Sequence, residues 1–306
     1  MTNLDPAGFI TRENGSDMRD ATTYKFNRPP FYKLYGEQLV KYMMNNFPKT
    51  CYAVIKNWLT EDETSEFLND YRNTKKSEND QYQLIGASKN LLLKQKSKIL
   101  EICNSTGLNV DLISSFAIYT DTSWTDWSWH QDHESFYFNQ QHENYLNFYV
   151  ILEKENPQLS GLSIIPMNAL ENLIPEHMNK IINSGAKRFF PEGDITKVLC
   201  DETDTEYTLP VNLDSIAIHP ELVAGDLLLI RGDVIHRTQD TLTKRTAISI
   251  RCTQGSSIIS KEKLMSGGNL KRKLLDIGNS RTKEICKSFG NNNMLTAKNL
   301  FKDFTL

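Results

Sequence analysis

Three features that would place a protein in an exported, membrane or zinc-thiolate class are missing from this sequence. The five cysteines are odd in number and widely scattered, and no Cys-x-x-Cys pair occurs, so neither a disulfide framework nor a zinc-thiolate site is indicated. No apolar run approaches the roughly 18 residues that a membrane-spanning helix needs. The N-terminus also lacks a basic stretch followed by an apolar one. We therefore expect a globular protein of a reducing compartment, the cytoplasm.

A strong excess of one charge is missing too. The formal net charge of the 306 residues is -3, which gives no electrostatic reason to expect binding to nucleic acid. The charge is uneven, however, because residues 261–306 carry 10 Lys or Arg against 4 Asp or Glu. Solvated helices with exposed lysines explain this basic tail most simply, and contact with an anionic partner stays an alternative.

The order of apolar and turn-forming residues predicts a mainly β domain with flanking helices. Thr60 to Glu63 has the pattern of a capping box and predicts a helix that runs to about Tyr71, and residues 90–107 predict a second helix. Short strand-like runs separated by turn signals indicate a barrel or sandwich. These runs are residues 52–55, 116–119, 146–152, 162–165, 215–218, 227–230 and 245–251.

The same pattern suggests three regions. Residues 1–50 are an expected arm or lid, residues 51–255 the main domain, and residues 256–306 a basic, helical C-terminal extension. We expect a helical insertion within the main domain at about residues 167–190.

The chemistry of the main domain is indicated by His130-Gln131-Asp132 and by His236, about a hundred residues later. Side chains two residues apart on a strand point to the same side, so His130 and Asp132 could reach one ion while Gln131 faces away. His236 follows a run that predicts a buried strand and a turn, which could bring a third ligand to the same ion. Two imidazoles and one carboxylate are the ligand set of non-haem Fe(II) oxygenases. A surface His and Asp on a polar strand is the simpler alternative for the motif taken alone.

A cation for a dicarboxylate lies on a later strand. Arg245 and Arg251 share one face with Ala247 and Ser249 if this segment is extended, and a buried arginine without an anion would be strongly unfavourable. An iron oxygenase that uses 2-oxoglutarate needs such a guanidinium for the distal carboxylate. Arg245 is the favoured anchor and Arg251 the alternative, and either arginine could instead lie at a strand end in water.

Three further polar residues are candidate cosubstrate contacts. Thr238 lies two residues after His236, and Asn147 and Tyr149 share a face within an otherwise apolar strand. Asn147 and Tyr149 could point inward, or they could belong to an edge strand. Trp124, Trp127 and Trp129 lie just before the first ligand and could wall a substrate pocket, although core packing explains each equally well.

Four segments together resemble the phytanoyl-CoA dioxygenase-like family of Fe(II)/2-oxoglutarate-dependent oxygenases. They are residues 52–63, Trp129-His-Gln-Asp132, Ser160-Gly-Leu-Ser-Ile-Ile-Pro166, and Gly225-Asp-Leu-Leu-Leu-Ile through His236-Arg-Thr to Arg245. The resemblance implies a double-stranded β-helix core (a jelly-roll, cupin-like) and His130, Asp132 and His236 as iron ligands. It also implies Arg245 as the anchor of 2-oxoglutarate, with Thr238 beside it.

The resemblance further implies a dioxygenase that consumes 2-oxoglutarate and O2 and hydroxylates an unactivated C–H bond, with release of succinate and CO2. A small-molecule or lipid-linked substrate is expected. Met167-Asn168-Ala169 follows Pro166 where the family often has Gly-Ser-His, and the gap from His236 to Arg245 is short, so Arg251 stays open as the anchor. The alternatives are a protein or nucleic-acid hydroxylase on the same fold and a non-catalytic metal or ligand binder. The oligomeric state is not indicated.

Overall fold

The structure, a computed structural model, describes residues 3–4, 10–11, 47–73, 89–120, 128–240, 242–277 and 279–302. Most of the expected arm over residues 1–50 therefore lies outside the described residues, as do Trp124 and Trp127. In the part that is described, no helix is long and apolar enough to cross a membrane.

One layer of the fold is a five-stranded antiparallel sheet, the major sheet, in the order β3-β10-β5-β12-β4. Its strands are β3 (Tyr52–Ile55), β4 (Leu112–Thr120), β5 (Tyr145–Lys154), β10 (Leu227–Arg231) and β12 (Arg245–Thr253). Alternate residues of β5 supply its two faces, since Leu146, Phe148 and Val150 belong to one buried cluster and Tyr149 and Ile151 to another. The strand β5 lies between β10 and β12, so the edge-strand alternative for Asn147 and Tyr149 is wrong.

The facing layer, the minor sheet, is built from shorter strands. They are β6 (Leu162–Ile164), β7 (Lys187–Glu192), β8 (Ile195–Cys200), β9 (Thr205–Leu209) and β11 (His236–Thr238). His130 joins the two-stranded sheet β11-β6 to the three-stranded sheet β7-β8-β9 through isolated bridges to His236 and Arg188. A buried cluster fills the space between the two sheets, with side chains such as Tyr149, Leu228 and Ala247 from the major sheet and Ile164, Phe189 and Val198 from the minor one. Two facing antiparallel sheets with helices outside are the expected jelly-roll.

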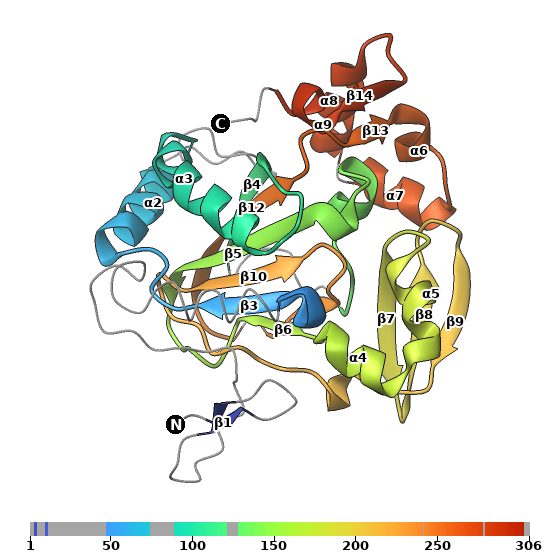
Figure 1. Ribbon diagram of the computed structural model, residues 1–306, viewed down its shortest axis with the longest axis horizontal. Coiled ribbons are helices and arrows are strands. Elements are labelled where there is room, and N and C mark those ends of the chain that lie inside the picture. Colours follow the sequence, from blue (N-terminus) through green and yellow to red (C-terminus); the bar gives the residue numbers. More distant parts are fainter. Residues whose placement is uncertain are drawn as a thin grey trace.

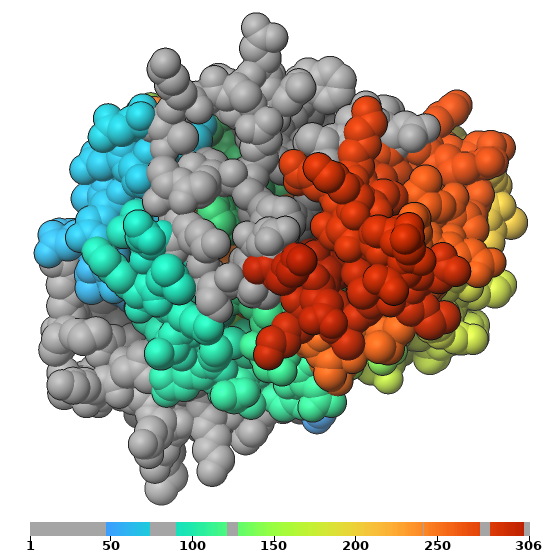
Figure 2. Space-filling view, turned by 90° about the horizontal axis from the view of Figure 1, so that it is seen from above, coloured from blue at the N-terminus to red at the C-terminus, as the bar shows by residue number. Residues whose placement is uncertain are grey.

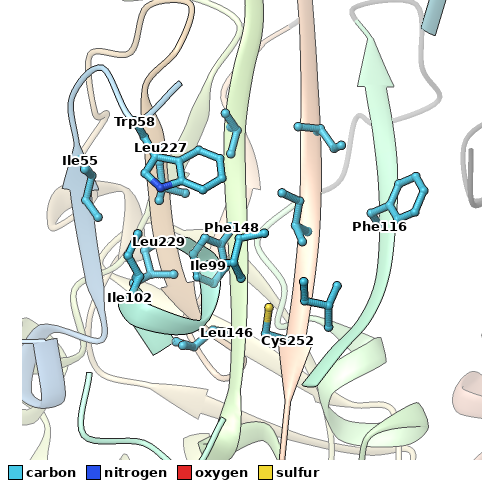
Figure 3. Close-up of a cluster of buried hydrophobic side chains, with 14 of the residues drawn as sticks. Ile55, Trp58, Ile99, Ile102, Phe116, Leu146, Phe148, Leu227, Leu229 and Cys252 are labelled. Atoms are coloured by element: carbon cyan, nitrogen blue, oxygen red, sulfur yellow. The ribbon is translucent and has the colours of Figure 1, made fainter. Parts of the chain in front are cut away.

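Helices cover the outer face of the major sheet. The helices α2 (Glu61–Asn73) and α3 (Lys89–Ser105) lie at one edge of Figure 1, and β7, β8 and β9 lie at the other, with the major sheet between them. Figure 3 shows the cluster under the helices, where Ile99 and Ile102 of α3 meet Phe148 and Leu229 of the sheet. The predicted capping box is present, since the Thr60 amide donates to Glu63 at 2.8 Å and the Glu63 amide to the Thr60 hydroxyl at 3.2 Å.

The C-terminal extension is a packed unit. Its elements are β13 (Ile258–Ser260), α6 (Lys261–Met265), α7 (Asn269–Ile277), α8 (Asn279–Phe289), β14 (Met294–Thr296) and α9 (Ala297–Leu300). They form one continuous surface region in Figure 2. Inside the protein, Leu264, Phe289 and Phe301 pack with Phe136 and Tyr137, which belong to the π-helical turn η3 (Glu134–Phe138) directly after the His-x-Asp motif.

The remaining described elements are short. They are β1 (Asn3–Leu4), β2 (Ile10–Thr11), η4 (His142–Asn144), α4 (Met167–Leu173), η5 (Pro175–His177), α5 (Met178–Ile182) and η6 (Leu213–Ser215).

One sequence prediction about local structure is wrong, and the C-terminal bound of another differs. Residues 215–218 form no strand, because the Asn212 side chain caps the short helix η6 and only Ile218 makes a bridge, to Ile164. The helices of the insertion predicted at about 167–190 end at Ile182, and β7 begins at Lys187. The strands β7, β8 and β9 were not predicted, because their solvent-facing side is rich in charged and polar residues, which hides the strand pattern.

Candidate metal centre

The fold brings the three predicted ligands together. One candidate ligand atom from each of His130, Asp132 and His236 lies within 4.8 Å of the other two. His236 Nε2 is 3.7 Å from Asp132 Oδ1, and the two imidazole ring centroids are 4.4 Å apart. Distances of this size fit three groups around one ion, because each ligand atom would lie about 2 Å from it.

The backbone that carries these ligands differs from the predicted strand. His130 and His236 exchange two backbone hydrogen bonds, 2.9 and 3.0 Å long, which sets the two imidazoles side by side. His130 is an isolated bridge residue, and Asp132 lies outside the strands. Gln131 does face away, as predicted, and its buried amide donates to the carbonyls of Ile181 and Asp233. This anchor holds the short segment between the two ligands.

Each imidazole is oriented by its own backbone. His130 Nδ1 lies 2.8 Å from the Ser128 carbonyl, and His236 Nδ1 lies 2.9 Å from the Val234 carbonyl. A carbonyl only accepts, so Nδ1 carries the proton in both rings and Nε2 is the expected ligand atom. The same two-residue relation to a backbone carbonyl therefore orients both imidazole rings.

The protonation states also suit a cation. Burial and the neighbouring imidazole of His236 lower the pKa of His130 to about 3, so its ring is neutral near pH 7. Burial acts to raise the pKa of Asp132, but His236 and the Arg251 guanidinium outweigh it and hold that pKa below its usual value. Metal binding needs neutral imidazoles and an ionised carboxylate.

Polar side chains of the major sheet surround Asp132. Asn147 Nδ2 is 3.3 Å from Asp132 Oδ2, and the Ser249 hydroxyl donates to Asn147 Oδ1 at 2.5 Å. Arg251 lies on the same face of β12 as Ser249, and its guanidinium pairs with Glu134 at 2.9 Å and donates to the Tyr119 hydroxyl at 2.6 Å. The charge of Arg251 is therefore already balanced by a protein carboxylate.

Arg245 has a different environment. It is 2% exposed, and its guanidinium donates to the carbonyls of Ser160 and Thr120, both at 3.2 Å. Among the described residues no carboxylate lies within ion-pair distance of it, and its buried Nε has no hydrogen-bond partner. The Tyr149 hydroxyl is also buried beside Arg245; burial raises the pKa of Tyr149, and the charge of Arg245 and a hydrogen bond from it oppose that rise. A buried cation with unused donors fits an anion that arrives from outside the protein.

The strand positions of two other residues, Thr238 and Lys154, are also defined. Thr238 lies two residues after His236 on β11 and is 9% exposed. Lys154 is the cross-strand neighbour of Arg245, and burial together with Arg245 and Lys56 lowers its pKa to about 8. The sequence analysis missed Lys154, although its position at the end of β5 opposite Arg245 follows once the strands are aligned.

Glu134 and Tyr119 were also missed. Glu134 is four residues after His130, and Tyr119 is in the register position of β4 that faces Ala247. The two-residue period along β4 could have suggested Tyr119. The π-helical turn that points Glu134 at Arg251 has no comparable sequence signal.

Comparison with protein families gives one match. The family model described as phytanoyl-CoA dioxygenase (PhyH) matches residues 96–248, which include all three candidate ligands and Arg245. No curated protein sequence matches this chain.

Solved structures with a similar fold share little sequence. The apo form of EctD from S. alaskensis has a TM-score of 0.50 and 12% identity, and the match covers 78% of this chain and 86% of that one. EctD from S. alaskensis with 2-oxoglutarate and 5-hydroxyectoine gives 0.49 and 13%, over 80% and 91%. The non-heme alpha ketoglutarate dependent epimerase SnoN from nogalamycin biosynthesis gives 0.47 and 11%, over 72% and 85%. At such identities a likeness supports the fold alone.

Proposed function

This chain belongs to the phytanoyl-CoA dioxygenase family, and from that premise we propose that it hydroxylates an unactivated C–H bond of a polar small molecule. Family membership makes it an Fe(II)/2-oxoglutarate-dependent dioxygenase. The observation that carries the proposal is the convergence of His130, Asp132 and His236 within 4.8 Å. Two imidazoles and one carboxylate leave coordination positions for a cosubstrate and O2.

The three side chains fit iron in more than their spacing. Both histidines have Nδ1 engaged by a backbone carbonyl, and Asp132 is kept ionised by its neighbours. We therefore propose His130, Asp132 and His236 as the iron ligands. Iron bound with 2-oxoglutarate would activate O2 for the oxidation of the substrate, while the protein orients the reactants and excludes water.

Arg245 fits the distal carboxylate of 2-oxoglutarate better than Arg251. Arg251 is already paired with Glu134 at 2.9 Å, whereas Arg245 has no carboxylate partner among the described residues. We propose that Arg245 binds this carboxylate with help from the Tyr149 hydroxyl, and that Thr238 lies beside it. Arg251 then stabilises the region around Asp132 through its ion pair with Glu134 and does not bind the cosubstrate.

The surroundings of Asp132 favour a polar substrate over a lipid-linked one. Asp132, Glu134 and Arg251 keep 17%, 12% and 10% of their side-chain surface exposed, so charged groups surround this ligand. An acyl chain laid here would remove water from these charges without replacing its hydrogen bonds. A molecule with hydroxyl, carbonyl or amide oxygens would replace them.

The experiment is to measure O2-dependent succinate formation from 2-oxoglutarate with added Fe(II), for the wild type and for His130→Ala. We expect turnover by the wild type that is lost in the variant, and faster turnover with polar small molecules than with acyl-CoA thioesters. Iron binding without any turnover would instead favour the non-catalytic binder. Preference for acyl-CoA would contradict the polar substrate but not the enzyme class.

A further inference from the structure

We propose that Asn147 and Ser249 are positioning residues that fix the carboxylate of Asp132 in one orientation for the metal. The proposal rests on the proposed function, because it concerns how one of the proposed ligands is held. The two residues lie on β5 and β12, two interior strands of the major sheet, whereas Asp132 lies on a segment outside the strands. The chain of hydrogen bonds from Ser249 through Asn147 to Asp132, which we call the relay, therefore connects the sheet to a ligand that lies outside the strands.

The direction of the hydrogen bonds follows from the chemistry of the groups. An ionised carboxylate only accepts hydrogen bonds, so the group of Asn147 that lies 3.3 Å from Asp132 Oδ2 must be its NH2. The amide oxygen of Asn147 then points the other way, at the Ser249 hydroxyl 2.5 Å from it. Ser249 must therefore donate. A flipped amide would present its oxygen to a carboxylate, so the relay Ser249 to Asn147 to Asp132 has only one favourable polarity.

Burial makes this polarity strict. Ser249 is 1% exposed and Asn147 is 6% exposed, so water has little access to replace either hydrogen bond. An unsatisfied polar group there would pay its desolvation cost in full. The side chains lie on the same inner face of the sheet, because Asn147 pairs with Arg251 and Ser249 with Tyr149 in the register of β12 and β5.

The consequence for the ligand is geometric. The relay occupies Asp132 Oδ2, and Oδ1 is the oxygen that lies 3.7 Å from His236 Nε2. With Oδ2 held, Oδ1 would be the oxygen of Asp132 available to a bound ion. Without the relay, the carboxylate could rotate and offer both oxygens or neither. Partners of this kind commonly change metal affinity by about 10- to 100-fold.

The test uses Co(II) as the probe, with affinity from calorimetry and the ligand geometry from the visible absorption of the bound ion. We expect Asn147→Ala to weaken Co(II) binding by about 10- to 100-fold and Ser249→Ala by roughly tenfold. Both should alter the Co(II) spectrum, and Ser249→Thr, which keeps the hydroxyl, should restore both readouts. Ser114→Ala is the matched control, since Ser114 is also a buried serine of the sheet, but its hydroxyl donates to the Arg251 carbonyl at 3.2 Å.

A double variant separates a relay from two independent effects. If Ser249 acts through Asn147, adding Ser249→Ala to Asn147→Ala should cause no further loss of Co(II) affinity. Additive losses, or equal losses in Ser249→Ala and Ser114→Ala, would overturn the relay. Wild-type protein that binds Co(II), with variants that bind it equally well, would overturn the relay alone. Wild-type protein that binds no metal would overturn the metal centre and the relay together.

Discussion

Replacing Arg245 and Arg251 one at a time by methionine tests which arginine receives the cosubstrate. Methionine has a similar length and keeps the apolar packing, but it removes the charge. Arg245 gives up two hydrogen bonds to backbone carbonyls, and Arg251 gives up its ion pair with Glu134. We therefore expect Arg245→Met to lose binding of the cosubstrate but little stability, and Arg251→Met to lose stability but little binding.

The magnitudes follow from these contacts. Breaking a buried ion pair by removing one partner costs about 3–5 kcal/mol, so we expect Arg251→Met to be destabilised by about that much. Arg245→Met loses two hydrogen bonds of about 1 kcal/mol each but no longer buries a cation that has no carboxylate partner among the described residues, so it should stay within about 1 kcal/mol of the wild type. For cosubstrate binding, two charge-assisted hydrogen bonds of about 1.5–3 kcal/mol each predict a loss of at least 100-fold for Arg245→Met.

The assay is denaturant unfolding of each protein without ligand, followed by calorimetric titration of the Co(II)-loaded protein with 2-oxoglutarate. We expect Arg245→Met to fold normally and to bind 2-oxoglutarate very weakly, and Arg251→Met to be less stable but to bind it when folded. Normal binding by Arg245→Met together with lost binding by folded Arg251→Met would refute the assignment. Large destabilisation of Arg245→Met would refute the view that its charge lacks a protein partner.

Three further predictions concern the metal, the pH and a turn. Co(II) at about 100 times its dissociation constant should stabilise the chelator-treated wild type by about 2.7 kcal/mol, measured as a higher melting temperature. The same Co(II) concentration should not stabilise His236→Ala. Equal shifts of the melting temperature in both proteins would place the metal elsewhere. Lys154 loses its charge as the pH rises through its pKa of about 8, which removes one of two cations beside the expected carboxylate. The affinity for 2-oxoglutarate should therefore fall several-fold from pH 7 to pH 9, and it should fall less in Lys154→Met. An unchanged pH profile in that variant would show that Lys154 is not involved. Gly225 has φ +90°, and a Cβ there would lie 2.7 Å from the Leu59 carbonyl oxygen, so Gly225→Ala should cost about 1–3 kcal/mol in urea unfolding; Gly193→Ala, with φ +59° and open space around it, should cost less, and similar losses would mean that φ alone decides.

Much of the centre could be predicted from sequence because its groups are chemically unusual in their setting. The spacing of His130 and Asp132 and the arginines on an apolar strand indicated a cation and an anion site, and the structure brings the three predicted ligands together. The two-residue period of β12 also predicted correctly that Arg245, Ser249 and Arg251 share a face. What the period could not show was which arginine had a partner, since Glu134 reaches Arg251 from a π-helical turn.

The missed parts have a different cause. The strands β7, β8 and β9 carry polar side chains on their outer face, so hydrophobic alternation is weak there, although Arg188 of β7 pairs directly with His130. His130 and Asp132 were expected on one strand, but a single bridge and the buried Gln131 amide hold them instead. Such long-range contacts depend on residues about 50 to 100 positions away, which local sequence patterns do not report.

The packing of the C-terminal extension has a consequence for how the protein is made. Chain synthesis delivers His130, Asp132 and the turn η3 well before Leu264, Phe289 and Phe301, which pack against that turn. Domains generally fold as units while they leave the ribosome. The packing around η3 therefore stays incomplete on the nascent chain until the helices of this extension emerge.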